Sequence, residues 1–68
     1  MKLKIGVIGA GHLGKFHIDK LKSRKDIDFI GFYEKDENRS DYIKKELNVK
    51  SYRKLYNLIK NCDAVTIA

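Results

Sequence analysis

The sequence has only one cysteine, Cys62, in 68 residues. One cysteine excludes a disulfide framework, and no group of cysteines and histidines has the spacing of a metal site. The apolar N-terminal run, MKLKIGVIG, is interrupted by glycine and is too short for a secretory signal or a membrane span. Because a lone thiol without a targeting segment fits a reducing compartment, we expect a cytoplasmic protein with no membrane partner.

Long runs of one charge are also lacking. Nucleic-acid-binding tails usually contain blocks of about five or six like charges. Here 15 basic and 9 acidic residues give a net charge of +6 without any such block. The basic residues are mostly lysines scattered over the predicted helical faces, as on a solvated surface. We therefore expect no nucleic-acid partner.

Apolar runs alternate with segments of helical periodicity. Predicted strands lie at residues 2–8, 27–33, 49–50 and 64–68. Predicted helices lie between them, at 12–24, 37–47 and 52–60. This β-α-β-α-β-α-β order predicts an α/β fold with a parallel, Rossmann-type sheet and helices on both faces. Right-handed crossovers give the strand order 3-2-1-4, which is the first half of a dinucleotide-binding domain.

Single residues indicate the helix ends and packing faces. Asp36 is expected to cap the second helix, Asn48 to close it, and Ser51 to cap the third. The positions expected to pack inward share helical spacing. They are Leu13, Gly14, His17, Ile18 and Leu21 in the first helix, Ile43 and Leu47 in the second, with Tyr42 left open, and Tyr52, Leu55, Tyr56 and Ile59 in the third.

The segment IGVIGAGHLG places three glycines between the first predicted strand and the first predicted helix. Gly9 permits a tight turn, Gly11 lets a pyrophosphate approach the backbone, and Gly14 allows close packing of helix on strand. The N–H groups that open the helix face an anion at the positive end of the helix dipole. The pattern predicts a dinucleotide held by Gly9, Ala10, Gly11, His12, Leu13 and Gly14.

An acidic residue completes this signature. Glu34 ends the second predicted strand, twenty residues past Gly14. A carboxylate there accepts hydrogen bonds from the adenosine ribose and repels a 2′-phosphate, which favours NAD over NADP. Lys35, the next residue of the predicted cofactor site, and Arg39 could reach a 2′-phosphate if Glu34 turned away. NADP therefore stays open.

Three other side chains could carry chemistry. His12 is expected to contact a cofactor through its backbone alone, because the glycine motif acts through main-chain N–H groups. His17 lies on the inner stripe of the first helix and is expected to be a packed histidine. Cys62 has no evident base or oxyanion site, so we expect a small, partly buried residue. No catalytic residue and no metal ligand is assigned.

Three segments together resemble the N-terminal domain of the Gfo/Idh/MocA oxidoreductases. They are GVIGAGHLGKFH, the acidic Glu34 after IDFIGFY, and the closing YRKLYNL…CDAVTIA. The resemblance covers essentially the whole sequence, and His17 and the closing run are its more specific features. In that family the last strand continues into a Thr-Pro pair beside the nucleotide. This implies that Ala68, where the sequence stops, lies near the cofactor.

The resemblance implies an NAD(P)-dependent dehydrogenase acting on a sugar, a cyclitol or a nucleotide-linked sugar, and a homo-oligomer. The family's catalytic lysine lies after a fifth strand, and its other proton-transfer residues lie in a second domain. Residues 1–68 are then the N-terminal part of the dinucleotide-binding domain, without the catalytic domain, and we expect them to be inactive alone. A stand-alone NAD(H)-sensing module and a deliberately shortened folding unit remain alternatives.

Overall fold

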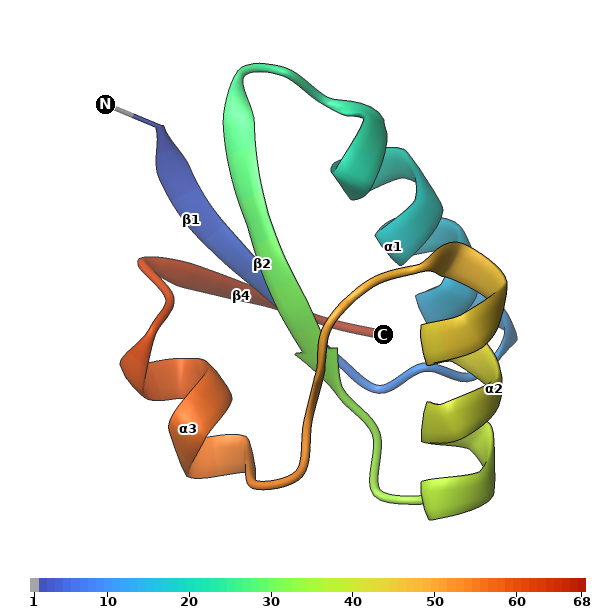
Figure 1. The fold of residues 1–68 in the computed structure, drawn as a ribbon. Helices are drawn as coiled ribbons and strands as arrows, with labels where there is room; N and C mark the ends of the chain where they lie inside the picture. The colour runs from blue at the N-terminus through green and yellow to red at the C-terminus, as the bar shows by residue number, and fades with distance from the viewer. Residues whose placement is uncertain (1) are drawn as a thin grey trace.

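The computed structural model describes residues 2–68 except for the side chain of His12, so the expectation for that side chain lies outside the described part. The element order is β1 (Leu3–Ile8), α1 (His12–Ser23), β2 (Ile27–Tyr33), α2 (Glu37–Leu47), β3 (Ser51–Tyr52), α3 (Leu55–Lys60) and β4 (Ala64–Ile67). All strand pairs are parallel, in the order β3-β2-β1-β4. Figure 1 shows β1, β2 and β4 of this sheet. The predicted strand order 3-2-1-4 is confirmed.

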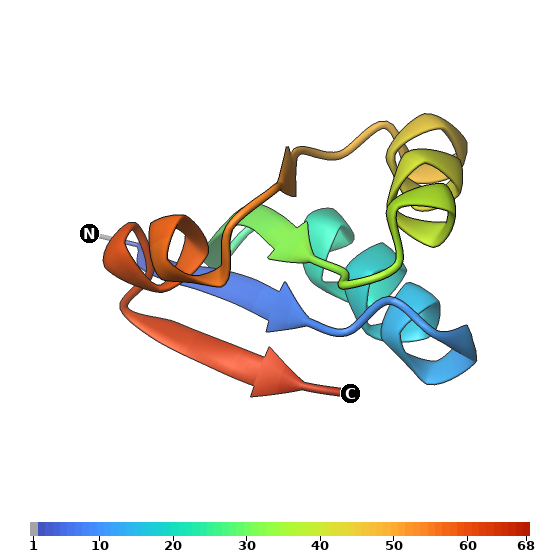
Figure 2. The same ribbon diagram turned by 90° about the horizontal axis from the view of Figure 1, so that it is seen from below.

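Helices cover both faces of the sheet, as predicted. Helices α1 and α2 lie on one face and α3 lies on the other (Figure 2). The reason is the handedness of the crossovers: the chain moves outward from β1 to β3 and then returns past β1 to β4. The core beneath α1 and α2 consists of Val7, Ala10, Ile18, Phe32, Ile43 and Leu47.

The ends of α2 agree with the sequence prediction. Asp36 is the N-cap, and its Oδ1 accepts hydrogen bonds from the N–H groups of Asn38 at 3.0 Å and Arg39 at 3.3 Å. Asn48 ends the helix in the left-handed conformation with φ 53°. Both ends are set by local side-chain chemistry, which is why the sequence predicts them well.

Replacing Asp36 with alanine is expected to lower the free energy of unfolding by about 1 kcal/mol, because two main-chain donors lose their acceptor. Urea denaturation followed by circular dichroism measures the change. Asp41→Ala is the matched control, because Asp41 is an exposed acid on the same helix. It should change the free energy of unfolding by no more than about 0.5 kcal/mol. Equal losses in both variants would contradict the capping role.

The inward face of α1 differs from the prediction. Ile18 is fully buried, Gly14 is buried and Leu21 is half-buried, whereas Leu13 is 68% exposed and His17 is also exposed. The packing of Gly14 onto the loop before the helix sets this rotation. The expectation of a packed His17 is therefore wrong.

The segment from residue 49 to 60 also differs. The short strand is Ser51–Tyr52 rather than residues 49–50. The Tyr52 ring packs on Gly31 so closely that a Cβ built on the glycine would lie 2.6 Å from it. Gly31 has φ +150° and follows a bulge at Ile30, where the β1–β2 register shifts. Tyr52 thus belongs to the sheet, and Ser51 caps no helix.

Helix α3 consequently begins three residues later than predicted and turns a different side to the sheet. Its N-cap, Lys54, makes no side-chain capping bond. Leu58 is fully buried, whereas Tyr56 is 72% exposed and Ile59 is 48% exposed. The predicted inner face of this helix is therefore wrong, and Leu58 is its anchor.

Candidate dinucleotide site

The candidate site lies where the carboxyl ends of β1, β2 and β4 meet. The Gly9 N–H donates to the Tyr33 carbonyl at 2.8 Å, and the Ala68 N–H donates to the Ile8 carbonyl at 3.0 Å. These bonds bring the glycine loop, the end of β2 and the end of the sequence together. In open parallel sheets, ligands bind at this edge.

Two of the three glycines serve the backbone itself. Gly9 has φ +93°, a conformation that side chains rarely adopt. A Cβ on Gly14 would overlap the Gly9 carbonyl oxygen and lie 2.9 Å from its carbon. Ala68 packs at the same place, since its Cβ would lie 3.5 Å from a Cβ built on Gly14. Only glycine at 14 lets α1 start this close to the end of β1.

Gly11 is different because the space around it is open. Its backbone is extended, with φ −68° and ψ −165°, and a Cβ built there meets no atom within 4 Å. The Gly11 carbonyl accepts the first hydrogen bond of α1, from the Lys15 N–H at 2.9 Å. Any residue could adopt this backbone, so the fold alone does not require glycine at 11.

The N-terminus of α1 is suited to an anion. In any α-helix the N–H groups of the first turn lack a carbonyl partner within the helix. At α1 no side chain caps them and no acid occupies the first turn, as far as the described residues show. Helix α2 instead has the Asp36 cap and Glu37 in its first turn. The first-turn donors of α1 thus lie next to Gly11, where a built Cβ meets no atom, and this arrangement fits a pyrophosphate.

Glu34 is fixed between the two loops. It is half-buried, its Oε1 accepts from the Ala10 N–H at 2.7 Å, and its Oε2 accepts from the Asp36 N–H at 2.9 Å. Each carboxylate oxygen has a second lone pair left for another donor. The carboxylate is thus oriented by the backbone before any ligand arrives.

The two cations near Glu34 differ in position. Lys35 is exposed at the start of the loop that leads to α2. The Arg39 Nε donates to the Ala10 carbonyl oxygen at 2.7 Å. The sequence identified Arg39 as a group near the cofactor but not its contact with Ala10. The two residues are 29 positions apart, and no local pattern joins them.

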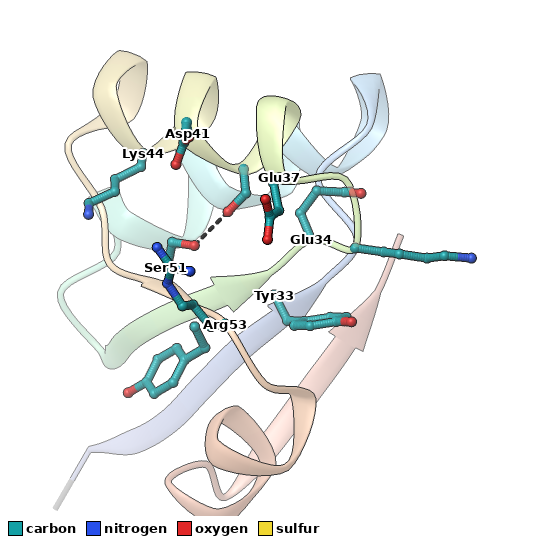
Figure 3. A pocket seen from close by; sticks show the side chains of 10 residues that line it. Tyr33, Glu34, Glu37, Asp41, Lys44, Ser51 and Arg53 are labelled. Atoms are coloured by element: carbon teal, nitrogen blue, oxygen red, sulfur yellow. Dashed lines mark hydrogen bonds between the residues drawn. The ribbon is translucent and has the colours of Figure 1, made fainter.

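A hollow of about 180 Å³ lies beside Glu34, between α2 and the ends of β2 and β3 (Figure 3). The Ser40 and Ser51 hydroxyl groups hydrogen-bond at 2.6 Å across the α2–β3 contact. No sequence pattern indicates this hollow, because its walls form only when β3 pairs with β2. Its charged lining residues are Glu34, Lys35, Glu37, Asp41, Lys44 and Arg53.

Cys62 is partly buried, as expected, and a Cβ on Gly6 would lie 2.7 Å from its Sγ. Burial raises the pKa of the Cys62 thiol, and the nearby Asp63 charge raises it further. The thiol is therefore protonated at neutral pH and is a poor nucleophile.

Within residues 2–68, leaving out the His12 side chain, no cluster of three or more metal-ligating side chains occurs. None of the described helices is long and apolar enough to cross a membrane.

Comparison with known proteins gives a consistent result. Residues 3–68 match the Gfo/Idh/MocA model, described as an oxidoreductase family with an NAD-binding Rossmann fold. UDP-N-acetylglucosamine 3-dehydrogenase of Acidithiobacillus ferrooxidans is 31% identical over 65 residues, which are 96% of this chain and 20% of that protein.

Solved structures agree. That of the A. ferrooxidans UDP-N-acetylglucosamine 3-dehydrogenase matches all of this chain and 22% of its own, with a TM-score of 0.87 and 29% identity. The myo-inositol 2-dehydrogenase of Lactobacillus plantarum matches all of this chain and 21% of its own, with a TM-score of 0.80 and 28% identity. The chain spans about a fifth of the length of these relatives. It belongs to the Gfo/Idh/MocA family of oxidoreductases and has their NAD-binding Rossmann fold.

Proposed function

We propose that residues 1–68 are the N-terminal part of the cofactor-binding domain of an NAD-dependent dehydrogenase. The observation that carries this proposal is the N-terminus of α1, which no described side chain caps, beside the open space at Gly11. An anion there would meet main-chain donors and the positive end of the helix dipole. The dinucleotide's nicotinamide would supply the hydride acceptor when bound.

Each predicted binding residue has a place in this proposal. Gly9 and Gly14 shape the loop, and Gly11 with the N–H groups of His12 and Leu13 receives the pyrophosphate. Glu34 receives the adenosine ribose through its remaining lone pairs. Ala10, Lys35 and Ala68 complete the cradle from the loop, the β2–α2 connection and the end of β4.

The proposed reaction is hydride transfer between nicotinamide and a hydroxyl group of a sugar, a cyclitol or a nucleotide sugar. The relatives support this substrate class, since one is a UDP-N-acetylglucosamine 3-dehydrogenase and another a myo-inositol 2-dehydrogenase. We assign only cofactor binding to residues 1–68. Proton transfer and substrate recognition are assigned to the remainder of a longer enzyme, as is assembly into a homo-oligomer.

Titration of NAD into the chain, followed by amide NMR, tests the cofactor proposal. We expect shifts at residues 9–14 and at Glu34, saturating at or below about 1 mM NAD. No shifts in the folded chain at that concentration would contradict the proposal. Oxidation of UDP-N-acetylglucosamine or myo-inositol by the complete gene product, followed by NADH absorbance, tests the substrate class separately.

Glu34→Gln is expected to raise the affinity for NADP relative to NAD by about tenfold. The variant removes the charge that repels a 2′-phosphate, and its one amide oxygen can still accept from the Ala10 N–H, although the bond from the Asp36 N–H is lost. Calorimetric titration of both nucleotides measures the ratio. Glu37→Gln removes the same charge from an exposed position nearby and should leave the ratio unchanged. A parallel rise in both variants would point to net charge rather than to Glu34.

A further inference from the structure

We infer that Arg39 is a positioning residue: it fixes the peptide group between Ala10 and Gly11 and so directs the Gly11 N–H toward the pyrophosphate position. The inference rests on the proposed function. It concerns a residue that reaches the glycine loop from α2, outside the loop itself.

The contact between Arg39 and the loop is specific. The Arg39 Nε lies 2.7 Å from the Ala10 carbonyl oxygen, in a half-buried place. The Ala10 side chain is fully buried in the core, so this residue has little freedom to move. A hydrogen bond from a charged donor is shorter and stronger than one between neutral groups.

The guanidinium group is itself held in place. Its central carbon lies 5.3 Å from the centre of the Tyr42 ring, and the Lys15 Nζ lies 5.1 Å from the same ring. The main-chain N–H of Arg39 is bonded to the Asp36 cap. Because the group is planar and rigid, its stacking on Tyr42 and its bond to Ala10 together fix its orientation.

Peptide geometry carries this constraint to Gly11. The Ala10 carbonyl and the Gly11 N–H belong to one planar trans peptide group, so they point in opposite directions. Because the carbonyl points toward Arg39 on α2, the Gly11 N–H points away from α2. A donor on the carbonyl also polarises the peptide group and makes its N–H a better donor.

The neighbouring peptide group is held as well. Glu34 accepts from the Ala10 N–H, which shares a peptide group with the Gly9 carbonyl that contacts Gly14. Two consecutive peptide groups of the loop are thus fixed by side chains from the β2–α2 segment. Glu34 and Arg39 act on opposite ends of the same residue, so neither can take over the role of the other.

Arg39→Met tests the inference, with Lys45→Met as the control. Lys45 is an exposed lysine on the same helix, so both variants lose one positive charge from α2. In the ligand-free chain, Arg39→Met should shift the Ala10 carbonyl carbon and Gly11 amide nitrogen resonances, and Lys45→Met should not. Tyr42→Leu, which keeps Arg39 but removes the ring beneath it, should give smaller shifts in the same direction.

Binding then separates a positioning role from general damage. Arg39→Met should weaken NAD and ADP-ribose binding by about tenfold, the effect of one misdirected donor, and leave adenosine binding unchanged. Equal losses for all three ligands, or unchanged Ala10 and Gly11 resonances, would overturn the inference. Arg39→Lys gives a further check. If this variant binds NAD as tightly as the parent chain while the Ala10 and Gly11 resonances stay shifted, the side chain contacts NAD directly through its charge, and the inference is overturned. Absence of NAD binding by the parent chain would instead refute the proposed function.

Discussion

Replacing Gly14 with alanine is expected to lower the free energy of unfolding by about 3 kcal/mol. The added methyl group would overlap the Gly9 carbonyl oxygen, which is main chain and cannot rotate away. The loss should appear even though alanine is favoured over glycine inside a helix by about 1 kcal/mol. In a chain this small such a change removes most of the stability, so the variant should be largely unfolded at 37 °C.

Gly11→Ala is the matched control for this experiment. It adds the same methyl group three residues earlier, at a position with no atom within 4 Å and an ordinary backbone conformation. Its urea denaturation midpoint should stay close to that of the parent chain. Equal destabilisation of both variants would contradict the assigned contact between Gly14 and Gly9. A stable Gly14→Ala chain would show that α1 can move away from β1 without loss.

The parts of the fold that the sequence predicted are those set by local chemistry. The alternation of apolar runs and helical periods determined the topology, because right-handed crossovers leave few arrangements. The bounds of β2 and α2 were predicted correctly. Asp36 and Asn48 act on their own neighbours, so their roles follow from sequence alone.

The predictions are wrong where a contact between residues far apart in the sequence determines the structure. The rotation of α1, which exposes His17, follows from the packing of Gly14 on Gly9. The start of α3 follows from the packing of Tyr52 on Gly31, across the sheet. Helical periodicity predicts that a helix has an apolar side. It does not predict the rotation of the helix about its axis when two neighbouring rows of residues both contain large apolar side chains.

The candidate site also combines features that the sequence predicts with features that depend on the packing of distant segments. The glycine spacing and Glu34 were predicted because the motif places each of them at a set distance from a strand end. The bond from Arg39 to Ala10 depends on how α2 packs beside the loop, and the hollow beside Glu34 depends on the pairing of β3 with β2. Neither arrangement leaves a spacing pattern in the sequence.

Gly11→Val is expected to weaken NAD binding by about a hundredfold while leaving the fold intact. The branched side chain would fill the open space where the pyrophosphate approaches the first turn of α1. Hydrogen bonds to a charged partner contribute about 1.5–3 kcal/mol each, so losing one or two of them accounts for a change of this size. Calorimetric titration of NAD measures it, and circular dichroism checks that the variant is folded.

Comparison of the two glycine variants separates folding from binding. Gly14→Ala should lose NAD affinity only in proportion to the unfolded fraction, whereas Gly11→Val should lose it as a fully folded chain. If Gly11→Val kept its affinity for NAD, the dinucleotide could not lie against the loop. The hollow between α2 and β3, beside Glu34, would then be the next place to search. Loss of affinity at Gly11 with no change in stability is the result that places the cofactor at the start of α1.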